Sequence, residues 1–176
     1  MYGKITLNAI LIILLSVSQI SFVSGLPGWF ADINLPIMVL VFMLALSGFR
    51  LALFWSFGMG LLLDIYSFLP FGIYMAVFPS IAILINFFLI HFFTNRSLYS
   101  FLALAALALL LHEILVYSLS YAVYFVNRQD LNVYFDGKFW SDQAGVFIMN
   151  LGAVFILFYL FTLAGKNLKP VFLIRR

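Results

Sequence analysis

Apolar stretches long enough to cross a lipid bilayer dominate this sequence. A membrane-spanning helix needs about 20 mainly apolar residues. Six stretches can be drawn on this criterion, approximately at residues 5–23, 35–49, 51–68, 73–93, 98–126 and 144–164. Only 9% of the residues are charged, whereas a water-soluble domain keeps about a quarter of its residues charged. The sequence therefore predicts an all-α fold: a polytopic membrane helical bundle of six transmembrane helices, forming one integral membrane domain over residues 1–176.

Two of these spans leave alternatives open. The second is short and opens at Leu35-Pro36, and only Arg50 separates it from the third. A tight helical hairpin and a tilted, continuous pair of helices would both give this pattern. The first span has the positive start of a signal peptide at Lys4 and small residues near Val23. Its apolar run of about 19 residues exceeds the 7–15 of a signal peptide, so we expect a retained span.

The distribution of positive charge predicts the orientation. Lys and Arg are enriched in the cytoplasmic loops of membrane proteins. If the N-terminus lies inside, seven of the nine fall on the cytoplasmic side and two outside. The cytoplasmic set is Lys4, Arg50, Arg96, Lys166, Lys169, Arg175 and Arg176, and the outer set is Arg128 and Lys138. We therefore expect both termini in the cytoplasm and an outer loop at Asn127–Gln143.

The residue types argue against several functional classes. The chain has no cysteine, which excludes disulfides and thiolate metal sites. Its nine Lys and Arg are spread out and form no nucleic-acid-binding patch. Neither a metalloprotease HExxH motif nor a hydrolase GxSxG motif is present, and His91 and His112 differ too much in depth to hold a haem together. We expect no enzymatic activity, no cofactor, no metal and no nucleic-acid partner.

Ionisable residues inside the spans are candidates for function because charge is costly there. These residues are Asp64, His91, His112 and Glu113. Asp64 and Glu113 both lie about 20 Å from the cytoplasmic end of their spans, so the two could meet in a polar pocket. Tyr117 shares a helix face with Glu113. The sequence thus predicts an intramembrane polar cluster of Asp64, His112, Glu113 and Tyr117.

Small residues line one face of the third span. Ser56, Gly60 and Asp64 are spaced by four residues, with Gly58 beside them, and small residues at this spacing let another helix approach closely. Together with Gly72 they are the predicted contacts for helix packing or for a partner. For Asp64 we favour a structural role, accepting hydrogen bonds from the Leu69–Gly72 turn or a neighbouring helix, over a proton-relay or ligand role.

The second to fourth spans resemble the rod shape-determining protein MreD family. The likeness rests on Pro36, on Gly58-Met-Gly60-Leu-Leu-Leu-Asp64-Ile and on Leu69-Pro-Phe-Gly72, and it covers Leu35–Ala76. It implies a non-enzymatic scaffold in the bacterial cytoplasmic (inner) membrane. Such a scaffold would bind an MreC-type membrane protein and other proteins of the elongation machinery, and it would support peptidoglycan synthesis.

This family is similar in fold to the substrate-binding membrane subunits of energy-coupling-factor vitamin transporters, and that likeness supplies an alternative function. A binding subunit needs an enclosed polar cavity for a small molecule. A scaffold needs an exposed surface for another span. We expect the scaffold, and therefore no small-molecule ligand.

Overall fold

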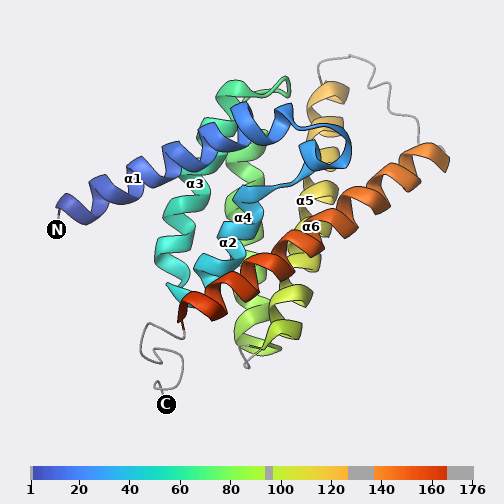
Figure 1. Ribbon diagram of the computed structural model, residues 1–176. Coiled ribbons are helices and arrows are strands. Elements are labelled where there is room, and N and C mark those ends of the chain that lie inside the picture. The colour runs from blue at the N-terminus through green and yellow to red at the C-terminus, as the bar shows by residue number, and fades with distance from the viewer. Residues whose placement is uncertain (1, 94–96, 127–136, 166–176) are drawn as a thin grey trace.

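The computed structural model describes residues 2–93, 97–126 and 137–165, and every regular element in these ranges is helical. The α-helices are α1 (Tyr2–Val17), α2 (Leu35–Leu46), α3 (Phe49–Tyr66), α4 (Ile73–His91), α5 (Leu98–Val126) and α6 (Gly137–Gly165). Between α1 and α2 lie a π-helical turn at Ser18–Phe22 and 3₁₀ turns at Val23–Gly25 and Gly28–Asp32. Five of the described helices are long and apolar enough to cross a membrane. The predicted polytopic helical bundle is thereby confirmed (Figure 1).

The second predicted span, residues 35–49, is wrong in length. α2 has 12 residues and rises about 18 Å, against a hydrocarbon core about 30 Å thick. It ends because Gly48 adopts a φ of 96°, a left-handed conformation that glycine adopts without strain. The chain then reverses into α3, so α2 and α3 form a tight hairpin rather than a continuous helix (Figure 1).

α2 forms the centre of the core. A helix that is apolar on all sides is usually buried, and eight of its 12 residues are buried. It packs against α3, α4 and α5. Asn34 caps the N-terminus of α2, because its side-chain Oδ1 accepts a hydrogen bond from the Ile37 backbone N–H at 3.2 Å. The short helix α2 is therefore a core element, and no face of it is exposed on the outside of the bundle.

The first and last helices lie at the periphery. In each of them only 11% of the most apolar stretch is buried within the chain. α1 packs on α3, and α6 packs on α5 and on Gly28–Asp32. α6 begins at Gly137, so the predicted outer loop up to Gln143 is too long: its last seven residues belong to the helix. Several charges that predicted the orientation lie outside the described residues: Arg96, Arg128, Lys166, Lys169, Arg175 and Arg176.

Candidate functional site

Asp64 caps the start of α4 from the neighbouring helix α3. The residue is buried, and its Oδ1 and Oδ2 accept hydrogen bonds from the backbone N–H groups of Tyr74 and Met75, at 2.9 and 2.8 Å. The first N–H groups of a helix have no partner within the helix, and the helix dipole favours a negative charge beside them. Asp64 thus holds α4 against α3. This geometry agrees with the structural role favoured for Asp64.

Two glycines make this junction possible. A Cβ atom at Gly60 would lie 2.6 Å from the carbonyl oxygen of Tyr74, which is closer than a side-chain carbon can come to backbone. Gly72 directly precedes α4 and has a φ of 102°, which favours glycine. Three features therefore form the α3–α4 junction together: the Leu-Pro-Phe-Gly turn, the close approach at Gly60 and the cap from Asp64.

The remaining small residues of α3 also face the interior. Ser56 is fully buried, and its Oγ donates a hydrogen bond to the Leu53 carbonyl oxygen at 2.7 Å. A Cβ atom at Gly58 would lie 3.1 Å from the Ile12 side chain, so Gly58 faces α1. The small-residue face therefore packs within the chain, with Ser56 and Gly60 buried and Gly58 half-buried against α1.

The predicted polar cluster is divided between two places. Asp64 is held at the α3–α4 junction, whereas Glu113 and Tyr117 line a cavity between α5 and α6 whose lining does not include Asp64. The expectation of one shared pocket is therefore wrong, because α4 lies between α3 and α5. His112 bridges the two places: its ring stacks on Tyr74 at a centroid distance of 6.1 Å, and its Nδ1 lies 3.2 Å from Glu113 Oε1.

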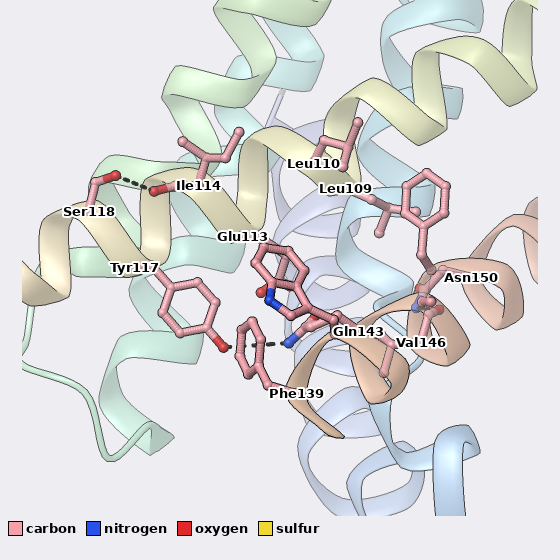
Figure 2. A pocket seen from close by; sticks show the side chains of 13 residues that line it. Leu109, Leu110, Glu113, Ile114, Tyr117, Ser118, Phe139, Gln143, Val146 and Asn150 are labelled. Atoms are coloured by element: carbon pink, nitrogen blue, oxygen red, sulfur yellow. Dashed lines mark hydrogen bonds between the residues drawn. The ribbon is translucent and has the colours of Figure 1, made fainter. Parts of the chain in front are cut away.

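The cavity between α5 and α6, called here the α5–α6 cavity, has a volume of about 640 Å³ and opens to the outside of the bundle. Most of its lining side chains are apolar. Among the described residues, the lining is Leu109, Leu110, Glu113, Ile114, Tyr117, Ser118, Phe139, Trp140, Gln143, Ala144, Val146, Phe147 and Asn150. Figure 2 shows Tyr117, Phe139 and Gln143 gathered on one side, with Leu109 and Asn150 toward the other. Gln143 Nε2 lies 3.5 Å from Tyr117 Oη.

Negative charge gathers near this cavity. Asp32 belongs to none of the long helices, and burial raises its pKa above the usual value. The negative charges of Glu113 and Asp142 raise the pKa of Asp32 further. Repulsion of this kind requires that the three carboxylates lie within electrostatic reach of one another. The three carboxylates, of which Glu113 lines the cavity, therefore lie near one another.

Two amide side chains, which the sequence reasoning missed, fix the irregular segment before α2. Gln19 Nε2 donates to the Ile33 carbonyl oxygen at 2.9 Å, and Gln19 Oε1 accepts from the Leu35 N–H at 3.0 Å. Asn150 Oδ1 accepts from the Asn34 N–H at 2.8 Å, and its Nδ2 donates to the Asp32 carbonyl oxygen at 3.0 Å. Non-helical backbone at membrane depth is tolerated only when the protein satisfies its polar groups.

The signal for this pair was visible as single amides inside apolar runs. Gln19 and Asn150 interrupt apolar spans in the same way as the ionisable candidates do. Asn150 is fully buried and lies near the middle of the apolar stretch Phe139–Leu160. It therefore draws the start of α2 to the centre of α6, which explains why α2 is so short.

The other candidate residues show no catalytic arrangement. His91 is exposed at the end of α4, where its Nδ1 lies 2.8 Å from the Phe87 carbonyl oxygen. Within the described ranges no group of three or more His, Cys, Asp or Glu residues is placed to hold a metal ion.

The fold and site define a multi-pass helical membrane protein with a buried α3–α4 junction and a partly open cavity between α5 and α6. The rod shape-determining protein MreD family matches residues 4–164, nearly the whole chain. The chain belongs to this family, and its role lies in rod shape determination. The match confirms the resemblance drawn from residues 35–76 and extends it to all six helices. No curated protein and no solved structure matches the chain.

Proposed function

We propose that this protein is a non-enzymatic membrane scaffold of the cell-wall elongation machinery. In this role it binds an MreC-type membrane protein and supports peptidoglycan synthesis. The observation that carries the proposal is the family match over residues 4–164. The proposed location is the bacterial cytoplasmic membrane with both termini inside, which is supported by the seven-to-two distribution of Lys and Arg.

The arrangement of the helices supports contact through the peripheral helices. The α3–α4 junction is used inside the chain, whereas α1 and α6 leave most of their apolar stretch uncovered by the rest of the protein. Leu14 of α1 is 57% exposed and Ile156 of α6 is 60% exposed. Helices in lipid associate by close packing and buried polar contacts, so these faces are suitable for another span.

The α5–α6 cavity does not favour the alternative function of a vitamin-binding transporter subunit. Such a subunit needs an enclosed polar cavity. This cavity is partly open to the outside of the bundle, and most of its lining side chains are apolar. The scaffold is therefore the function that the geometry supports better.

Co-purification with an MreC-type partner in mild detergent tests the proposal. Leu14→Trp and Ile156→Trp add bulk to the exposed faces of α1 and α6, and Ile83→Trp adds the same bulk to an exposed position of α4, which is 53% exposed. We expect one of the first two variants to lose the partner while remaining monodisperse, and the α4 variant to retain it. Failure of the unaltered chain to retain the partner, when both are produced in one membrane, would overturn the proposal.

A further inference from the structure

Within the described residues, the Glu113 carboxylate in the α5–α6 cavity has no Lys or Arg within ion-pair distance. Its side chain is 42% exposed, and its only ion-pair partner within the described residues is His112 Nδ1 at 3.2 Å. His112 is buried, and its Nε2 has no hydrogen-bond partner in the described part of the chain.

Three aromatic rings line the same cavity as this carboxylate. The ring centroids of Tyr117 and Phe139 are 5.9 Å apart at 70°, and those of Phe139 and Trp140 are 5.5 Å apart at 84°. All three rings line the same cavity as Glu113. Aromatic faces attract ammonium groups, and cages of such rings recognise quaternary ammonium ligands. One carboxylate with several aromatic rings is therefore a suitable environment for an ammonium group.

The rest of the cavity fits an apolar chain. Leu109, Leu110, Ile114 and Val146 form its other walls, and Leu110 and Ile114 are more than half exposed on α5. The volume of about 640 Å³ lies within the usual range of small-molecule sites, about 300–1,000 Å³. The cavity opens to the outside of the bundle, so an amphiphile can enter it from there.

We propose that the α5–α6 cavity binds an amphiphile through its ammonium group, with Glu113 as the counter-ion and Tyr117, Phe139 and Trp140 around the cation. The apolar chain of the ligand lies along α5. The ammonium group comes either from the amino headgroup of a membrane phospholipid or from a free cationic amphiphile. This site is independent of the scaffold function proposed above.

Matched amphiphiles test the charge requirement. Dodecyltrimethylammonium and dodecyldimethylphosphine oxide share a chain length and differ in headgroup charge. We expect the ammonium compound, but not the neutral one, to raise the melting temperature of the full-length protein in a non-ionic detergent. Glu113→Gln should weaken ammonium binding at least tenfold, whereas Asp142→Asn should leave it unchanged because Asp142 does not line the cavity.

A second variant and a lipid experiment complete the test. Trp140 is 63% exposed, so Trp140→Leu should fold normally and should also weaken ammonium binding. Native mass spectrometry from nanodiscs of phosphatidylethanolamine or phosphatidylglycerol then separates the sources: retained phosphatidylethanolamine identifies the lipid, and binding of the free compound alone identifies a cationic amphiphile.

Three results would overturn the proposal. The first is equal binding of the charged and neutral compounds, and the second is ammonium binding by Glu113→Gln as tight as that of the unaltered protein. The third combines two findings: the unaltered protein binds no ammonium compound, and Glu113→Gln loses a protein partner. In that case the cavity would receive a basic side chain of the partner. Partner co-purification that survives while ammonium binding fails would leave the scaffold function intact.

Discussion

Replacing Gly60 by alanine should strain the contact between α3 and α4. The added Cβ would lie 2.6 Å from the Tyr74 carbonyl oxygen and 3.0 Å from the Met75 Cα, and neither backbone atom can rotate away. Overpacking of this kind costs about 1–3 kcal/mol, whereas the helix propensity of alanine over glycine returns about 1 kcal/mol. Moving the helices apart would also lengthen the hydrogen bonds that Asp64 accepts from the start of α4.

Gly58→Ala is the matched control because it lies in the same helix and receives the same gain in propensity. Its added Cβ would meet the Ile12 side chain at 3.1 Å, and a side chain can move. The difference in unfolding free energy between the two alanine variants therefore isolates the backbone clash, and we expect about 1–3 kcal/mol. Reversible unfolding with sodium dodecyl sulfate in mild detergent, followed by circular dichroism, measures it. Equal unfolding free energies would refute the close packing of Gly60 on α4.

Three further predictions concern the buried polar contacts and the topology. Asp64→Leu should lower the folded yield because it leaves two backbone N–H groups at the start of α4 without an acceptor, at a cost of about 1–3 kcal/mol each. Asp64→Asn keeps one acceptor and should be better tolerated. Equal folded yields for the two variants would contradict this. Gln19→Leu and Asn150→Leu should each destabilise the protein, and the double variant should deviate from additivity, since both residues fix the same segment. Reporter fusions after Arg176 and within residues 127–143 should give opposite compartment signals; the same signal from both would disprove the topology.

Much of the helix pattern could be predicted because it depends on local chemistry. The predicted fifth span agrees with α5 at both ends, Leu98 and Val126, and the turn that ends in Gly72 correctly marks the start of α4. The boundary between α2 and α3 was harder to place. It depends on the left-handed conformation of Gly48, and the sequence has only a short polar interruption between the two helices.

Only part of the candidate site could be predicted, because its geometry depends on contacts between residues far apart in the sequence. The spacing of Ser56, Gly60 and Asp64 correctly indicated one buried face. Depth alone suggested that Asp64 and Glu113 could meet, but depth says nothing about which helix lies between them. The hydrogen bonds of Asn150 join residues more than 100 positions apart, and no local pattern predicts such a pair.

The placement of the family-like motif inside the chain changes how its variants should be interpreted. A bulky residue at Gly60 or an apolar residue at Asp64 would disturb the α3–α4 junction before it could affect any contact outside the chain. Loss of rod shape in such a variant would therefore report loss of the fold, and it would carry no information about partner binding. Substitutions at exposed positions of α1 and α6, such as Leu14 and Ile156, leave the buried core in place. A partner contact is established only when such a variant keeps its folded yield and loses the complex.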